Sequence, residues 1–295
     1  MKVILTGGEG FIGSNFIKKF NNEFDITIIS SSDNNSKKIA KTIYASVSDK
    51  KIIKIIEEEN PDVVIHLAGL SGLKKCEMEP EKAFDVNVSG TANVVKGCSK
   101  ANAKLIYISS REVYGSTIDK KSKENDLLKP VNIYGKTKKK AEKIIINEAK
   151  NSKLNYIILR LTNVYGPGSN TGINHMILES LNKEKIILNG GEQVLNFIFI
   201  DDVIELIHLT LVNNKLFRKI FNIGSNDTMS LKDFSETLIE LSNKKIQVEF
   251  RKKPSFESLF FQPDITKQCQ VLGYIPKIGI KDGIIKTLQD MRDNC

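Results

Sequence analysis

The feature of this sequence that most constrains its fold is a regular alternation of short apolar runs with helical patterns over residues 2–161. The apolar runs are rich in Val, Ile and Leu, which is typical of strands buried on both faces of a parallel sheet. Helices that alternate with such strands cover the two faces of the sheet. The predicted strands and helices, in chain order, are Lys2–Thr6, Phe11–Phe20, Ile26–Ser30, Lys50–Asn60, Val63–Leu67, Glu81–Lys100, Leu105–Ser109, Tyr134–Lys150 and Asn155–Leu161. The pattern therefore predicts a doubly wound α/β fold.

The rhythm changes after Gly168, which indicates a second and smaller lobe. The later predicted strands are Asn196–Ile200 and Lys219–Ile223, and the later predicted helices lie near residues 230–243 and 279–292. We therefore predict a dinucleotide-binding domain of residues 1–168, to which residues 196–224 return, and a smaller α/β substrate-binding lobe of residues 169–195 and 225–295.

The charge of the chain favours small anionic ligands over nucleic acid. It has 44 Lys and Arg residues against 35 Asp and Glu residues, a formal net charge of +9. The lysines are scattered, aromatic residues make up 7% of the chain, and the sequence has no helix-turn-helix or RNP-like pattern. We expect solvated lysine surfaces and no nucleic-acid partner.

Cysteine spacing and hydropathy narrow the class further. Cys76, Cys98, Cys269 and Cys295 form no C-x-x-C pair, and no His lies at metal-ligand spacing from them. We therefore expect reduced thiols and no metal site. No apolar run reaches the roughly 18 residues of a membrane span. Because the first residues also lack a signal-peptide pattern, we expect no membrane partner and a cytoplasmic location.

A glycine-rich loop, GGEGFIG at residues 7–13, follows the first predicted strand and opens the first predicted helix. Glycines permit a tight turn and let backbone N–H groups and the positive helix terminus approach a pyrophosphate. The strand before the loop and the helix after it are the context that such a motif requires. The loop therefore predicts a Rossmann-type dinucleotide site, with cofactor contacts from Gly7, Gly10, Phe11, Ile12 and Gly13.

The end of the second predicted strand bears on the choice between NAD and NADP. An acidic residue at this point bonds the ribose 2′-hydroxyl of NAD, but here the strand ends in Ser30, Ser31 and Ser32. Lys37 and Lys38 follow. Hydroxyls with nearby cations suit a 2′-phosphate, so we expect NADP, with contacts from Ser30 and Ser31. Asp33 leaves NAD open.

Tyr134 and Lys138 lie four residues apart, on one face of a predicted helix. Such a pair is expected about once by chance in a chain of this composition, so its position carries more weight than its spacing. The pair follows SSREVYG at residues 109–115, which closes the fifth predicted strand. Ligands of open α/β sheets bind outside the carboxyl ends of the strands. Because the segment ends a strand at that edge, Arg111 and Glu112 need not form a buried ion pair.

Together these motifs resemble the extended short-chain dehydrogenase/reductase family, the NAD(P)-dependent nucleotide-sugar epimerases, dehydratases and reductases. The matching segments are TGGEGFIGS at 6–14, PDVVIHLAG at 61–69, FDVNVSGTANVV at 84–95, IYISSREVYG at 106–115, YGKTKKKAE at 134–142, RLTNVYGPG at 160–168, FIFIDDV at 197–203 and the tail at 263–284. The seven motifs before the tail, taken in order, are far more specific than any one of them.

The resemblance implies three catalytic roles. Tyr134 exchanges the substrate hydroxyl proton, Lys138 binds the nicotinamide ribose and lowers the tyrosine pKa, and Ser110 hydrogen-bonds the sugar. Glu112 acts only if the reaction includes elimination. The further cofactor contacts that we expect are Leu67, Ala68, Gly69, Ser109, Tyr134, Lys138 and Tyr165, and the expected substrate contacts are Ser110, Glu112, Asn163 and Lys253. His66 and Asn87 are expected to make structural hydrogen bonds.

Two departures from the family pattern affect the substrate and the reaction. Many members carry an Arg that clamps the substrate diphosphate where this chain has Leu195, so the cluster Arg251–Lys253 is the alternative source of cations. Dehydratases often carry an acidic Asp where this chain has Arg111, and an arginine cannot act as a general acid near neutrality.

The function expected from these residues is a nucleotide-sugar 4-epimerase, which removes hydride from C4 and returns it to the other face. The alternatives are an NADPH-dependent nucleotide-4-keto-6-deoxysugar reductase, a sugar-nucleotide 4,6-dehydratase and a non-enzymatic dinucleotide-sensing protein. The resemblance further implies a homodimer that pairs through the helices Glu81–Lys100 and Tyr134–Lys150.

Overall fold

The computed structural model describes residues 1–31, 40–117, 120–169 and 172–293, and within these ranges its centre is a seven-stranded parallel sheet. The strands, in spatial order, are β10 (Lys219–Ile223), β6 (Tyr156–Leu161), β5 (Lys104–Ser110), β4 (Val63–His66), β1 (Lys2–Thr6), β2 (Asp25–Ser30) and β3 (Lys41–Tyr44). The order in which the chain adds strands reverses at β1, since β2 and β3 lie on one side of it and β4, β5 and β6 on the other. Doubly wound folds bind their ligands at such a switch point. The predicted Rossmann-type fold is confirmed.

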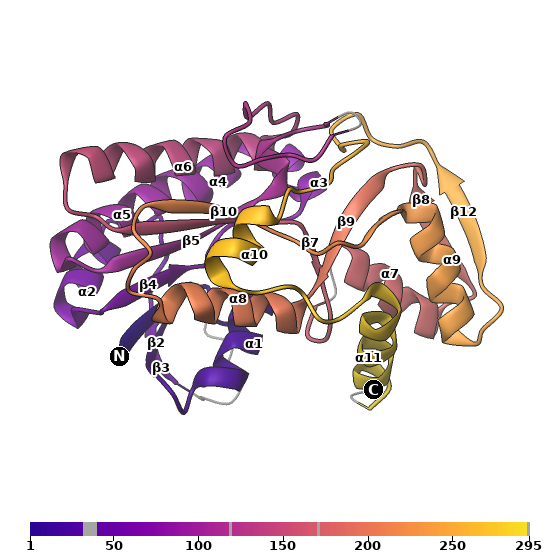
Figure 1. Cartoon of the computed structure of the whole chain (residues 1–295), viewed down its shortest axis with the longest axis horizontal. Helices are drawn as coiled ribbons and strands as arrows, with labels where there is room; N and C mark the ends of the chain where they lie inside the picture. Colours follow the sequence, from indigo (N-terminus) through magenta and orange to yellow (C-terminus); the bar gives the residue numbers. More distant parts are fainter. Residues whose placement is uncertain (32–39, 118–119, 170–171, 294–295) are drawn as a thin grey trace.

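Helices cover both faces of this sheet (Figure 1). The helices of one face are α2 (Lys51–Glu59), α5 (Gly90–Ala101) and α6 (Ile133–Asn151), and those of the other are α1 (Phe11–Phe20) and α8 (Ile200–Val212). In β1, Ile4 packs toward the first set of helices, whereas Val3 and Leu5 pack toward the second. Strands with both faces buried need apolar residues at successive positions, which explains the runs seen in the sequence.

The helix predicted over Glu81–Lys100 is divided into three parts. It comprises α4 (Pro80–Phe84), a π-helical turn η1 (Asp85–Ser89) and α5. The π turn carries Asn87, whose side-chain oxygen accepts from Leu70 N at 2.7 Å and whose amide nitrogen donates to Leu70 O and to Thr137 Oγ1. The amide thereby ties the loop after β4 to α6, which confirms the structural role expected of Asn87.

The second lobe is built from small sheets and helices around them (Figure 1). Its strands form a three-stranded sheet of β11 (Thr228–Ser230), β9 (Val194–Phe199) and β7 (Asn163–Tyr165) and a pair of β12 (Gln247–Arg251) and β8 (Lys185–Asn189). Its helices are α7 (Ile173–Asn182), α9 (Leu231–Ser242) and α11 (Ile280–Asp293). Three further short helices complete the structure: α3 (Leu73–Met78) follows β4, η2 (Arg111–Val113) follows β5, and α10 (Thr266–Leu272) lies in the C-terminal segment.

The segment 196–224 is shared between the two parts of the molecule. Strand β9 joins the small sheet through β7 and β11, whereas α8 and β10 belong to the main sheet and its cover. Helix α10 contacts α8 and β10, so part of the C-terminal segment also lies against the main sheet. The domain boundaries drawn from the sequence stay a prediction. Across the described ranges, none of the helices combines the length and the apolar character needed to span a membrane.

Candidate active site

The glycine loop lies between the ends of β2 and β4. Gly7 has a φ of +70° and donates its N–H to Ile29 O at 2.9 Å, and a Cβ built on it would lie 2.8 Å from the backbone of Ala68. A Cβ on Gly13 would lie 2.6 Å from Gly8, so α1 packs directly on the loop. Helix α1 begins after Gly10, which offers no capping side chain. The loop is therefore a backbone cradle that fits a pyrophosphate at a helix N-terminus.

His66 ends β4 beneath this loop and is completely buried. Its Nδ1 lies 2.6 Å from Thr6 Oγ1 and its Nε2 lies 3.0 Å from Thr91 Oγ1. Burial, aided by the charge of Lys138, lowers the pKa of His66 to about 3. A neutral imidazole with a partner on each nitrogen is a structural group, which agrees with the sequence interpretation.

Tyr134 and Lys138 enter the site from the first turns of α6. Asn132 caps this helix by accepting the Gly135 N–H at 2.7 Å. Lys138 Nζ donates to Ile108 O in β5 at 2.7 Å and lies 5.8 Å from the centre of the Tyr134 ring. A Cβ on Gly69 would lie 3.7 Å from the same Nζ. The ammonium group therefore sits between β5 and the loop that follows β4.

Burial dominates the proton affinities of these two residues. It lowers the pKa of Lys138 to about 8, although Glu142 acts in the opposite direction. It raises the pKa of Tyr134 above its usual range, with Cys76 and Glu112 adding to the effect and Ser110 opposing it. The lowering of the tyrosine pKa expected from Lys138 is therefore not supplied by the protein groups around Tyr134.

Arg111 and Glu112 form a buried ion pair in η2, directly after Ser110. Arg111 Nη2 lies 2.8 Å from Glu112 Oε1, and the two side chains are 9% and 5% exposed. Asn132 Nδ2 donates to Glu112 Oε2 at 2.7 Å, so both carboxylate oxygens are engaged. Glu112 N donates to Ser110 Oγ at 3.2 Å. The view that these charges need no pairing is thus corrected, because the strand edge leaves them too little water to stand alone.

A second buried pair, not foreseen from the sequence, joins Arg160 of β6 to Glu142 of α6. Arg160 donates from Nε and Nη2 to the two oxygens of Glu142 at 3.0 and 2.7 Å. Ser109 Oγ donates to Glu142 at 2.6 Å. The Ser109 hydroxyl is therefore engaged in the core, and the cofactor contact expected of it stays a prediction.

Tyr165 lies in the core of the second lobe. It is completely buried, its ring lies edge-on to Phe199 and Phe234, and its hydroxyl leaves no room for a Cβ on Gly283 of α11. Phe199, Phe234 and α11 together enclose the side chain, and the cofactor contact expected of Tyr165 stays a prediction. The packing against α11 is a long-range contact of which the motif NVYG carries no sign.

The two remaining predicted substrate residues bind parts of their own chain. Asn163 Nδ2 donates to Asn196 O at 2.8 Å, which joins β7 to β9. Lys253 Nζ donates to Pro254 O and Glu257 O. Their substrate contacts stay predictions.

At the cofactor end, Ser30 is buried and Ser31 is exposed. Ser32, Asp33, Lys37 and Lys38, which entered the choice of NADP, lie outside the described residues.

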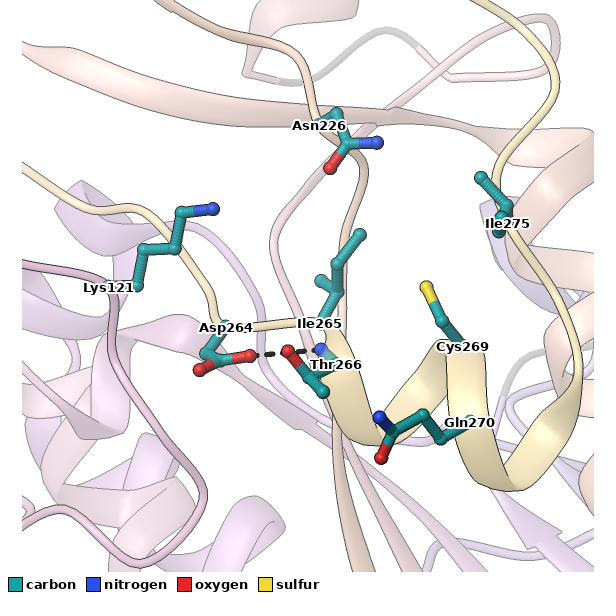
Figure 2. Close-up of a pocket in the computed structure, with 8 residues that line it drawn as sticks. All are labelled: Lys121, Asn226, Asp264, Ile265, Thr266, Cys269, Gln270 and Ile275. Carbon is teal, nitrogen blue, oxygen red and sulfur yellow. Dashed lines mark hydrogen bonds between the residues drawn. The ribbon is translucent and has the colours of Figure 1, made fainter.

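A pocket of about 410 Å³ surrounds α10 at a different place in the molecule (Figure 2). Its lining residues are Lys121, Asn226, Asp264, Ile265, Thr266, Cys269, Gln270 and Ile275. Asp264 Oδ1 accepts the Thr266 N–H at 2.9 Å and is thereby occupied with starting the helix. No residue predicted for the active site lines this pocket, so the motifs and this hollow are separate features.

A glycine cradle with Ser110, Tyr134 and Lys138 at the same edge of a Rossmann-type sheet defines a dinucleotide-dependent enzyme of the short-chain dehydrogenase/reductase type. The chain belongs to the NAD dependent epimerase/dehydratase family, whose family model matches residues 3–224.

Known proteins of similar sequence or structure include both epimerases and dehydratases. The chain is 29% identical to the human dTDP-D-glucose 4,6-dehydratase, over 99% of this chain and 90% of that one. It is 28% identical to a putative UDP-glucose 4-epimerase of Methanocaldococcus jannaschii, over 99% of each chain. The structure of the UDP-glucuronic acid 4-epimerase from Bacillus cereus, in complex with UDP-glucuronic acid and NAD, superimposes with a TM-score of 0.92 at 25% identity and covers both chains completely.

Proposed function

We propose that this chain is a nucleotide-sugar 4-epimerase that works with a bound nicotinamide dinucleotide. The observation that carries the proposal is the convergence of Lys138 Nζ, Gly69 and the Tyr134 ring at the ends of β4 and β5. A dinucleotide-sensing protein needs no proton-transfer group there. The similarity to UDP-sugar 4-epimerases supports the same conclusion.

The reaction assigns a distinct task to each residue. Tyr134 takes the proton of the sugar C4 hydroxyl and later returns it, and Ser110 donates a hydrogen bond to the same oxygen. Lys138 would hold the nicotinamide ribose hydroxyls, with its Nζ 5.8 Å from the centre of the Tyr134 ring. The nicotinamide supplies the acceptor for the C4 hydride and the donor that returns it. Rotation of the keto sugar between the two transfers inverts C4.

Dehydration is the second candidate, because Glu112 is buried beside Tyr134 and the human relative is a 4,6-dehydratase. Elimination requires a group that gives and takes protons freely. Glu112 is held on one oxygen by Arg111 and on the other by Asn132. This engagement favours epimerisation. A 4-keto-6-deoxysugar reductase is the third candidate, and it would release and rebind NADPH in each turnover.

The homodimer and the cytoplasmic location expected from the sequence belong to the same proposal, whereas the NADP preference expected from the sequence is one of two alternatives for the dinucleotide. The homodimer would pair the exposed surfaces of α5 and α6 of two chains, which light scattering on the purified chain measures directly. The dinucleotide that co-purifies, identified by mass spectrometry, separates NAD from NADP.

The proposal is tested by incubating the purified chain with UDP-glucose, UDP-glucuronic acid, UDP-N-acetylglucosamine and dTDP-glucose and following the products by proton NMR. We expect a C4 epimer of one UDP-sugar without net consumption of dinucleotide. A 4-keto-6-deoxy product would instead establish dehydration.

Tyr134→Phe should lower the turnover by about 10²- to 10⁴-fold, the usual contribution of a positioned acid–base group, and leave dinucleotide binding intact. Tyr156→Phe makes the same chemical change at the start of β6, remote from the site, and should leave turnover unchanged. Equal turnover in Tyr134→Phe and the wild type would rule out the mechanism.

A further inference from the structure

A carboxylate of the glycine loop reaches the end of β2. Ser30, the last residue of that strand, donates its hydroxyl to Glu9 Oε2 at 2.6 Å. Ser30 is buried and Glu9 is half-buried in the loop between β1 and α1. The two residues are 21 positions apart in the sequence, and their contact follows from the parallel pairing of β1 with β2.

Backbone hydrogen bonds fix both partners of this contact. Gly7 N donates to Ile29 O at 2.9 Å, which ties the start of the loop to the end of β2. Gly10 N donates to Gly7 O at 3.1 Å and closes the turn that holds Glu9. Ser30 O accepts the Ala45 N–H at 2.8 Å, which anchors the strand end from its other side. The carboxylate is therefore presented by a rigid turn.

The end of the second strand is where a Rossmann-type site binds the adenosine ribose, and a carboxylate there accepts the 2′-hydroxyl. In this chain the strand end carries Ser30, but the loop brings the Glu9 carboxylate within hydrogen-bonding distance of that position. We propose that Glu9, oriented by Ser30, is the residue that recognises the adenosine ribose diol and selects NAD over NADP. This inference rests on the proposed function, since it concerns the same dinucleotide.

The negative charge of Glu9 determines which of the two dinucleotides is favoured. A carboxylate has about four lone-pair positions and accepts ribose hydroxyls readily. A 2′-phosphate brings a charge of roughly −1.5 to −2 and no donor at neutral pH, so beside Glu9 it meets a like charge. This preference is opposite to the one expected from the serines and lysines at the end of the strand, and it comes from a residue inside the glycine motif.

Equilibrium binding to the full chain by isothermal titration calorimetry tests the assignment. The wild type should bind NAD⁺ at least about tenfold more tightly than NADP⁺. Glu9→Gln keeps the size of the side chain and removes its charge, so it should weaken NAD⁺ about tenfold and bring the two affinities close together. Asp25→Asn makes the same change of net charge at the other end of β2 and should leave the ratio unchanged.

A second, independent experiment moves the carboxylate from the glycine loop to the end of β2. The double variant Glu9→Ser, Ser30→Asp moves the acid from the loop to the strand end and should restore the NAD preference that Glu9→Ser alone loses. A wild type that prefers NADP⁺, or an affinity ratio that is the same in Glu9→Gln, would overturn this inference and leave the proposed function standing. A wild type that binds neither dinucleotide would overturn both.

Discussion

Two buried arginine–carboxylate pairs lie near the end of β5, and they differ in how many of their hydrogen bonds are made. Arg160 makes a two-point contact with Glu142, and its remaining nitrogen donates to Tyr114 Oη and to Glu124 O. Arg111 makes one contact with Glu112, and its Nη1 has no hydrogen-bond partner among the described residues. The first pair holds β6, α6 and the loop after η2 together. The second lies directly beside Ser110.

Burial alone does not indicate whether an ion pair is structural. A buried pair stabilises a fold only when nearly all of its hydrogen bonds are made. The Arg160 pair meets this condition, whereas the Arg111 pair retains an unpaired donor at the edge where the substrate is proposed to bind. We therefore expect the first to control stability and the second to control turnover.

Breaking the Arg160–Glu142 pair should have the largest effect on stability. Arg160→Met leaves Glu142 buried without its cation and should lower the free energy of unfolding by about 3–5 kcal/mol in urea denaturation. Arg251→Met, at an exposed pair with Glu249, is the matched control and should change it little. A loss under about 1 kcal/mol for Arg160→Met would contradict the structural role of the pair.

His66 is a buried titratable group that, unlike the two ion pairs, is neutral and has a partner on each ring nitrogen. Its pKa of about 3 lies below its unfolded value of 6.5, so the unfolded chain takes up the proton first as the pH falls. The resulting stability is present above pH 6.5 and is lost toward pH 3. Between pH 7.5 and pH 5 the loss should be about 2 kcal/mol.

The measurement for His66 is urea denaturation across that pH range. His66→Gln should flatten the profile, because its amide does not titrate. Parallel profiles for the variant and the wild type would show that other groups cause the acid sensitivity.

Breaking the Arg111–Glu112 pair, which leaves one arginine nitrogen without a hydrogen bond, should have the smallest effect on stability. Arg111→Met should lower the free energy of unfolding by about 1–2 kcal/mol, since it also removes an unpaired buried donor. Turnover should fall about tenfold or more, because loss of the pair loosens η2, whose Glu112 N–H positions the Ser110 hydroxyl. A stability loss equal to that of Arg160→Met, together with unchanged turnover, would erase the distinction between the two pairs.

Much of the cofactor half could be predicted from local sequence. The strand Lys2–Thr6, the helix Phe11–Phe20 and the strand Lys219–Ile223 have the bounds that the pattern predicts. The helix of Tyr134 begins one residue earlier than predicted, at Ile133. The periodicity of apolar residues and the spacing of the glycines depend only on residues close together in the chain, so the sequence alone shows them.

The strands and helices of the second lobe were harder to predict from the sequence. Strands β8 and β12 are short and pair across some sixty positions of the chain. Strand β8 alternates exposed with buried residues, and β12 has no fully buried residue. The sequence also missed α7, which packs against α9 and α11. Short elements of this kind are stabilised by partners distant in the chain, so a local pattern carries little information about them.

The sequence by itself determined the doubly wound fold and the glycine loop between its first strand and first helix, because both follow from local spacing and strand order. The grouping of Ser110, Tyr134 and Lys138 in one site was predicted from the resemblance to the family. Only the tertiary structure decided that Tyr165 belongs to the core, that Arg111 and Glu112 are paired with Asn132, and that Glu9 meets Ser30. These outcomes depend on which distant segments exclude water from a side chain, and a local pattern cannot specify that.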